Sequence, residues 1–255
     1  FPASGRSFSA FLSVHDPALH AATIFKRLLT ARGIQVEGDA RSRDFRVAES
    51  DRVDPRTAVE LANIESAPLS EIVRETNKES NNLFAELLLR TLGKERGATA
   101  PDPNPRRNAT RGDDVAGTAV VKKWLSDHGV AVRDLAIHDG SGLSRLDLIT
   151  PESAVRLLIA MAKSPSSASF RNSLPIAGRD GTLRGRLMPI AGRVSAKTGY
   201  LTYTHALSGY VITTNGEELA FSIICNDATG QSRAGRTIDA IVTLLAQYGS
   251  QRSAK

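Results

Sequence analysis

Apolar positions recur with helical spacing through the first two thirds of the chain. The clearest helix start is Asp16-Pro17, where an N-cap acid precedes a proline suited to the first helical turn. Apolar residues follow at intervals of three and four until Gly33. Residues 68–92 show the same spacing with an interruption near Ser80, which predicts two helices with a break between them. Further helices are expected at 113–128, from Thr150-Pro151-Glu152 onward, and at 232–248.

The pattern changes after Lys163, where short apolar runs replace the helical spacing. Asn215-Gly216 separates two of these runs and is a strong hairpin signal. Short strands are also expected at 34–36 and 58–66, whereas the Ser- and Pro-rich patch at 164–169 is interpreted as a linker. The strands expected after the linker are 194–199, 206–214 and 218–225.

Composition is that of a soluble globular protein, with 255 residues, 41% hydrophobic and 24% charged. No apolar run approaches the roughly 18 residues of a membrane span. The first residues lack the pattern of a signal peptide, which indicates either a cytosolic protein or a missing start. The single cysteine, Cys225, excludes an intrachain disulfide, and the five histidines show no metal-ligand spacing.

The charge is basic, with a formal net value of +6 and a pI near 9.7. Of the 33 basic residues, 25 are arginines, and they are spread along the chain. The densest cluster, Arg106-Arg107 to Arg111, has no interleaved aromatic residues. This distribution favours a solvated basic surface over a nucleic-acid-binding face, although such a surface would also suit an acidic polymer.

Two short motifs carry candidate chemistry. Ser80-Asn81-Asn82 lies at an expected helix start, and Lys197-Thr198-Gly199 lies on an expected strand. Each has an ordinary explanation, because serine is a favoured N-cap and a surface lysine can precede a turn glycine. Together, and in this order, they match two of the three sequence elements of penicillin-recognising serine acyl-transferases.

These residue types fit acyl transfer at a peptide bond, which needs a nucleophile, a proton path to the leaving amine and donors for the oxyanion. A serine–asparagine pair can relay the proton and hold the substrate backbone. A lysine–threonine pair can bind a terminal carboxylate, and Gly199 lets substrate lie close to the strand edge. We therefore expect Ser80, Asn82, Lys197 and Thr198 to line one site.

Longer stretches resemble the class C low-molecular-mass penicillin-binding proteins, which are D-alanyl-D-alanine carboxypeptidases and endopeptidases of bacterial cell walls. The resemblance covers roughly residues 10–250. It is carried by PLSEIV (68–73), SNNL (80–83), LLRTLG (88–93), DGSGLS (139–144), GTL (181–183), SAKTG (195–199) and ALSGY (206–210).

The resemblance implies an α/β (α+β) fold like that of transpeptidases and β-lactamases, with an antiparallel sheet flanked by helices and a helical subdomain. It also implies a periplasmic or otherwise extracytoplasmic location, no metal or other cofactor, a peptidoglycan peptide ending in D-Ala-D-Ala as substrate, and β-lactams as acylating inhibitors. Ser80 would relay protons, Asn82 would contact the substrate amide, and Lys197 and Thr198 would bind its carboxylate end. The backbone N–H of Tyr200 would form half of the oxyanion hole, although threonine is more usual at that position.

The family also requires a Ser-x-x-Lys nucleophile motif, and none of the eight lysines follows a serine at this spacing. Thr23-Ile24-Phe25-Lys26 has the spacing with a threonine, and it is interpreted as ordinary amphipathic helix; Thr91 and Lys94 are the other such pair. Residues 1–57 are interpreted as the end of an inserted accessory domain, and residues 58–255 as the C-terminal part of the transpeptidase-like domain. The nucleophile is then expected on an N-terminal segment of the same protein.

Three functional hypotheses follow. The first is a carboxypeptidase or endopeptidase that acts through a serine acyl-enzyme once the N-terminal segment is present. The second is a non-catalytic remnant that binds cell-wall peptide, and the third is a basic nucleic-acid-binding domain. The first two require the Ser80–Asn82 pair and the Lys197–Thr198 pair to lie side by side.

Overall fold

The computed structural model describes residues 13–43, 57, 59–97, 114–229 and 231–249. The chain forms two compact units, Phe1–Glu65 and Ser66–Lys255. The Arg106–Arg111 cluster lies outside the described residues.

The first unit contains the expected helix, α1 (Pro17–Ala31), whose N-cap side chain, Asp16, accepts a hydrogen bond from the Leu19 N–H at 2.9 Å. The strands expected at 34–36 and 58–66 are wrong, because the described residues there have no regular structure. Leu61 and Ile64 are 93% and 97% exposed, so neither side chain is covered by a described strand or helix. A lone strand is not stable without such a partner.

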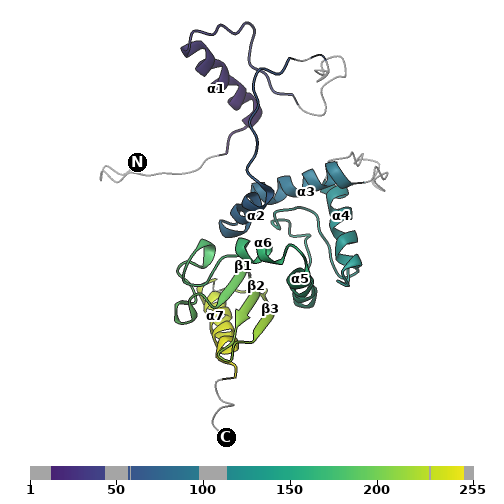
Figure 1. Ribbon diagram of the computed structural model, residues 1–255, viewed down its shortest axis with the longest axis vertical. Coiled ribbons are helices and arrows are strands. Elements are labelled where there is room, and N and C mark those ends of the chain that lie inside the picture. The colour runs from purple at the N-terminus through teal and green to yellow at the C-terminus, as the bar shows by residue number, and fades with distance from the viewer. Residues whose placement is uncertain (1–12, 44–56, 58, 98–113, 230, 250–255) are drawn as a thin grey trace, which may run out of the picture. The chain divides into compact units, whose positions relative to one another are not determined.

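The second unit contains six α-helices and three strands within the described residues, and the expected helices, strands and break near Ser80 are confirmed. The patch at 164–169 is not simply a linker, because a short helix begins at Ser167 and places Phe170 against the core. The elements are α2 (Leu69–Lys78), α3 (Asn82–Arg96), α4 (Asp114–Asp127), α5 (Pro151–Lys163), α6 (Ser167–Ser173), β1 (Val194–Leu201), β2 (Thr204–Ile212), β3 (Glu218–Cys225) and α7 (Gln231–Gln247) (Figure 1). Two short 3-10 turns, η2 (Gly181–Leu183) and η3 (Met188–Ile190), precede β1.

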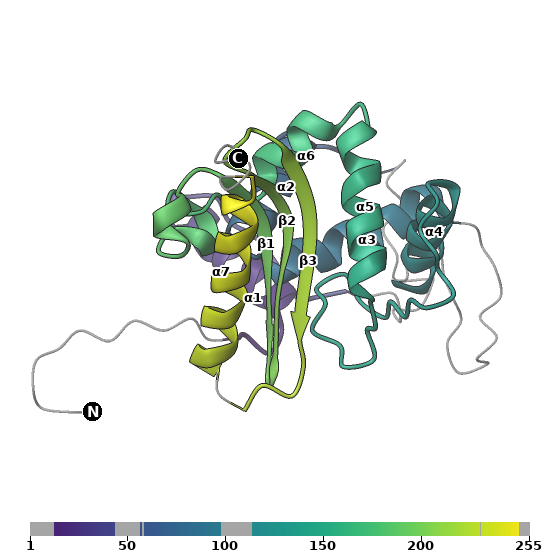
Figure 2. The ribbon, with the colours of Figure 1, turned by 90° about the horizontal axis from the view of Figure 1, so that it is seen from below.

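The three strands form an antiparallel sheet in the order β1-β2-β3. The expected hairpin joins β2 to β3, with Gly216 at a φ of 83° that suits glycine. Helix α7 packs on one face of the sheet, and α5 packs on the other (Figure 2). The sheet is therefore covered by helices on both sides, as the resemblance to transpeptidases and β-lactamases implies.

Alternation along β1 assigns its side chains to these two faces. Val194 and Ala196 are fully buried and belong to the same core cluster as Ile238 and Val242 of α7. Lys197 has the opposite parity and therefore lies on the face that α5 covers. This places the lysine on the side of the sheet where the helical cluster packs.

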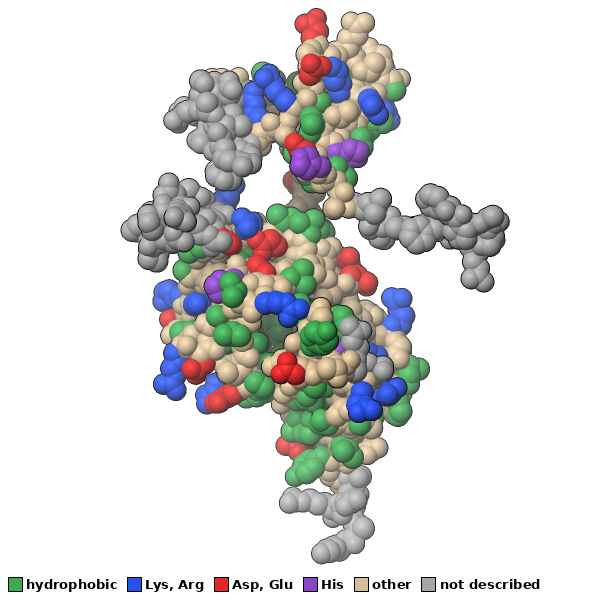
Figure 3. Space-filling model, turned by 180° about the vertical axis from the view of Figure 1, so that it is seen from behind, with side chains coloured by type: hydrophobic (Ala, Val, Ile, Leu, Met, Phe, Trp, Pro, Cys, Tyr) green, Lys and Arg blue, Asp and Glu red, His purple; other side chains and the backbone are tan. Residues whose placement is uncertain are grey.

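Basic and acidic side chains are interspersed on the face drawn in Figure 3. Several arginines form ion pairs, among them Arg171 with Glu218 and Arg186 with Asp239. None of the described helices is long and apolar enough to cross a bilayer.

Candidate active site

The turn between α2 and α3 presents Ser80 in an uncommon backbone conformation. Its φ is 57°, in the left-handed region that residues with a Cβ seldom adopt. The Asn81 N–H donates to the Thr76 carbonyl at 3.0 Å, a Schellman-type helix ending in which glycine usually occupies the position of Ser80. Asn81 also caps α3 through its side chain, which accepts from the Phe84 N–H at 3.1 Å. The N-cap explanation of Ser80 is therefore wrong, and its hydroxyl is available for another contact.

Lys197 makes that contact from β1. Its Nζ donates to Ser80 Oγ at 2.8 Å and to the Thr198 carbonyl at 2.9 Å, although Ser80 lies 117 positions earlier in the chain. Burial lowers the pKa of Lys197, because removal from water disfavours the charged ammonium. The structure thus brings together one residue from each of the two motifs.

The outer edge of β1 is partly covered and then becomes free of paired strands in the described part of the chain. Residues 175–177 pair with its first half, through Ala196 N–H to the Pro175 carbonyl at 2.9 Å and Ala177 N–H to the Val194 carbonyl at 3.0 Å. By the same alternation, the backbone N–H of Tyr200 points outward beyond this covered stretch. An extended peptide could pair with the edge at that point.

Thr198 and Tyr200 differ in what their side chains contact. The Thr198 hydroxyl shares a 2.8 Å hydrogen bond with the hydroxyl of Thr182 in η2. The Tyr200 ring lies edge-on to His205, with centroids 4.8 Å apart, on the sheet face opposite Lys197. Only the backbone of Tyr200 is therefore directed at the outer edge. Asn82 begins α3 with an exposed side chain, two residues after Ser80.

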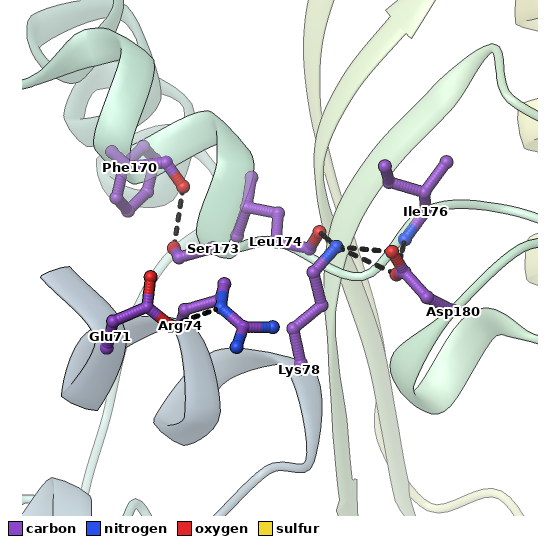
Figure 4. Close-up of polar contacts among 8 residues, drawn as sticks. All are labelled: Glu71, Arg74, Lys78, Phe170, Ser173, Leu174, Ile176 and Asp180. Carbon is purple, nitrogen blue, oxygen red and sulfur yellow. Dashed lines mark hydrogen bonds and ion pairs between the residues drawn. The ribbon is translucent and has the colours of Figure 1, made fainter.

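An ion pair close to Ser80, between a buried lysine and a partly exposed aspartate, was missed by the sequence reasoning. Lys78 Nζ donates to the two carboxylate oxygens of Asp180 at 2.8 and 2.7 Å and to the Leu174 carbonyl at 2.6 Å (Figure 4). Asp180 directly precedes the GTL stretch that carries part of the family resemblance. A lysine at a helix end and an aspartate before glycine are both common, so no local pattern indicated that they meet.

Two other candidate groupings have ordinary structural explanations. The His138–Gly142 stretch gathers a histidine, an acid and a serine but forms a turn, in which Asp139 accepts hydrogen bonds from the Gly142 N–H at 2.5 Å and the Ser144 N–H at 2.8 Å. Burial opposes ionisation of Asp139, but these N–H groups hold its pKa below the usual value. Within the described ranges, no cluster of three or more His, Cys, Asp or Glu side chains is placed to hold a metal ion.

Thr23 and Lys26 lie in the first unit, on one face of α1. The Thr23 hydroxyl donates to the Leu19 carbonyl at 2.8 Å, and the Lys26 ammonium donates to the Gly38 carbonyl. Both line a hollow of about 680 Å³ beside the helix. These contacts agree with an ordinary stretch of helix, because the two side chains bond to backbone rather than to each other.

Residues 1–248 match the family described as D-Ala-D-Ala carboxypeptidase 3 (S13). The chain belongs to the S13 family. This membership confirms the resemblance found from the motifs.

Relatives of this S13 chain include the D-alanyl-D-alanine carboxypeptidase of Actinomadura sp. (strain R39), which is 36% identical over 259 residues, or 99% of this chain and 44% of that protein. Penicillin binding protein 4 (dacB) of Haemophilus influenzae, solved with a β-lactam, superposes with a TM-score of 0.76 and 27% identity over 93% of this chain and 53% of that one. The extended-spectrum β-lactamase TLA-1 shares the fold, with a TM-score of 0.51 and 19% identity over 70% of this chain and 63% of that one. The transpeptidase/β-lactamase-like fold is therefore confirmed. The chain spans less than half the length of the curated relatives it matches.

Proposed function

We propose that this chain supplies the proton-relay and carboxylate-binding part of a serine-type D-alanyl-D-alanine carboxypeptidase that acts on peptidoglycan stem peptides. The observation that carries this proposal is the 2.8 Å contact between Lys197 Nζ and Ser80 Oγ, which joins the two sequence motifs in one place. Membership of the S13 family and the name of the Actinomadura relative support the reaction and the substrate class.

Ser80 and Lys197 act on the proton in the acylation step. A serine nucleophile attacks the carbonyl carbon of the penultimate D-Ala, an ester forms, and the C–N bond to the terminal D-Ala breaks. The leaving nitrogen needs a proton, which the Ser80 hydroxyl delivers; Lys197 gives Ser80 a proton in turn, and the proton released by the attacking serine restores Lys197. The lowered pKa of Lys197 brings its proton transfer closer to neutral pH than that of an exposed lysine. Water then hydrolyses the ester and releases the shortened peptide.

The substrate lies along the outer edge of β1 as an added strand. Lys197 and the Thr198 hydroxyl bind its terminal carboxylate, and Asn82 donates its side-chain amide to the peptide backbone. Gly199 presents no side chain between them. The outward N–H of Tyr200 provides half of the oxyanion hole, where one preorganised donor contributes roughly 10²–10³-fold to the rate.

The nucleophile belongs to a Ser-x-x-Lys motif on an N-terminal segment of the same protein, because none of the eight lysines here follows a serine at that spacing. In this proposal residues 1–57 end an inserted accessory domain and residues 58–255 form the C-terminal part of the transpeptidase-like domain. β-Lactams acylate the same serine, and the protein works outside the bacterial cytoplasm, where its substrate is found.

Fluorescent penicillin tests the division of the active site. Residues 1–255 alone should take no covalent label, whereas the protein with its Ser-x-x-Lys segment should be labelled on a serine of that segment. Peptide mapping by mass spectrometry identifies the labelled residue. A label on Thr23, Ser80 or any other hydroxyl of this chain would contradict the proposal.

The lack of a Ser-x-x-Lys motif also favours an alternative, a non-catalytic protein that binds cell-wall peptide. Both alternatives predict binding of a peptide that ends in D-Ala-D-Ala. Only the enzyme releases free D-Ala when the N-terminal segment is present. Binding without D-Ala release in that longer protein would therefore favour the non-catalytic alternative.

A further inference from the structure

The ion pair between Lys78 and Asp180 joins the turn that carries Ser80 to the segment beside β1. Lys78 is the last residue of α2 and is 8% exposed. Its ammonium has three hydrogen-bond partners, namely both oxygens of Asp180 and the Leu174 carbonyl (Figure 4). An ammonium has three donors, so this environment saturates it.

Asp180 is itself held by the segment that pairs with β1. Its Oδ1 accepts from the Ile176 N–H at 2.8 Å (Figure 4). The neighbouring Pro175 carbonyl accepts from the Ala196 N–H at 2.9 Å. Lys78 is therefore connected, through the carboxylate of Asp180, to the segment that pairs with β1, the strand that carries Lys197.

The turn after Asp180 continues this connection. Gly181 has a φ of 53°, and a Cβ at that position would lie 2.6 Å from the Lys78 carbonyl, so the turn packs closely on the end of α2. The next residue, Thr182, contacts the Thr198 hydroxyl at 2.8 Å. One short segment thus touches α2 on one side and β1 on the other.

We propose that Lys78 and Asp180 are positioning residues, which hold Ser80 within hydrogen-bond distance of Lys197 without touching substrate; this role presupposes the proposed function. Ser80 lies two residues beyond Lys78, in a conformation that its own backbone does not favour. Its direct link to β1 is one hydrogen bond to the end of a long lysine side chain. The ion pair adds a second link, and displacement of a catalytic group by about 1 Å can cost roughly 100-fold in rate.

A merely stabilising role makes a different prediction. Neutralising Asp180 leaves the buried Lys78 ammonium without its counter-charge and destabilises the protein, whereas neutral replacement of both partners removes that penalty. Stability should therefore recover in the double variant. The acylation rate should not recover if the ion pair holds Ser80 in place as a tether, because the neutral side chains do not restore the ionic link.

The test compares Lys78→Met, Asp180→Asn and the double variant in the protein that contains its Ser-x-x-Lys segment. Asp239→Asn is the matched control. It breaks the part-buried Arg186–Asp239 pair at 2.7 Å, which joins the chain after η2 to α7 and not to α2. We measure the melting temperature and, with a fluorescent penicillin, the dissociation constant and the first-order acylation constant. Each single variant should have a lower melting temperature, and its acylation constant should fall roughly 10- to 100-fold.

The double variant decides between the two roles. Recovered melting temperature with acylation still reduced supports positioning, and Asp239→Asn should lose stability with little change in acylation. Acylation that recovers together with stability would overturn the inference. If the wild-type protein takes no label, the proposed function fails, and hydrogen exchange of residues 79–84 and 196–201 then tests the tether. Exchange of these residues at the wild-type rate in the double variant would overturn the inference. Faster exchange of these residues, with the rest of the protein unchanged, would support it.

Discussion

At position 80 the chain keeps a serine where the backbone favours glycine. The left-handed conformation costs a residue with a Cβ roughly 1–2 kcal/mol. Strain of this kind persists where surrounding contacts enforce it, and it is concentrated at functional sites. The hydroxyl that glycine would lack is the atom that meets Lys197. The serine is therefore better explained by its hydroxyl than by the turn.

Ser80→Gly and Ser80→Ala separate the hydroxyl from the backbone. Both remove the contact with Lys197, but only glycine relieves the left-handed strain. We expect the glycine variant to be about 1 kcal/mol more stable than the alanine variant, with acylation lowered equally in both. Urea unfolding and β-lactam acylation measure the two effects. Equal stabilities, or wild-type acylation in either variant, would contradict this explanation of Ser80.

Lys197→Met tests the partly buried ammonium. The folded pKa of Lys197 is lowered by burial, whereas the unfolded chain has the ordinary value of about 10.4. Between those two values the unfolded state binds more protons, so wild-type stability rises with pH. The variant lacks this rise. The variant should be at least as stable as wild type at pH 7, and this difference in the free energy of unfolding should shrink by pH 10. Its acylation rate should fall about 100-fold or more.

Lys123→Met is the matched control for this pH effect. The Lys123 side chain is 77% exposed and pairs with Asp127, four residues later on α4. The difference in stability between Lys123→Met and wild type should not shift toward wild type between pH 7 and pH 10, as it should for Lys197→Met. A constant gap for Lys197→Met across the same pH range would show that its ammonium is not appreciably desolvated.

At the scale of elements, the backbone and the side chain of Tyr200 have different surroundings: its N–H points to the outer edge of β1, whereas its ring packs against His205. Tyr200→Pro removes the outward N–H without removing a bond to β2, and proline is tolerated on edge strands for this reason. We expect acylation to fall roughly 10²–10³-fold with the fold retained. Tyr200→Thr, which keeps the N–H, should stay close to wild type. Circular dichroism checks the fold, and equal acylation in the two variants would exclude the N–H from the site.

Elements were predictable where their determinants are local. The Asp16-Pro17 start of α1 and the Asn215-Gly216 hairpin depend on nearby residues, and both were placed correctly. The strands expected at 34–36 and 58–66 depend on a partner strand, which a local pattern does not report. The two motifs of the site were found because each is contiguous. Lys78–Asp180 was missed because its partners are 102 positions apart and each looks ordinary alone.

For the whole molecule, the candidate site is an assembly of three segments that meet only through packing. Ser80 comes from a helix–helix turn, Asp180 from the stretch before β1, and Lys197 from the sheet. The core between the sheet and α7 fixes the position of β1, since Val194 and Ala196 are fully buried there. Substitutions in this core would therefore affect the site through the position of the strand.

The basic charge of the whole molecule allows a final prediction against the nucleic-acid hypothesis. Tight binding to DNA needs several cations that reach phosphates together, and its affinity falls steeply with salt. Here the net charge is +6, basic and acidic side chains are interspersed on the face drawn in Figure 3, and arginines such as Arg171 and Arg186 are engaged by carboxylates. We expect no shift of duplex DNA by about 1 µM protein at about 150 mM salt. A salt-dependent shift below that concentration, reduced by neutralising Arg106, Arg107 and Arg111, would instead assign the basic cluster to nucleic-acid binding.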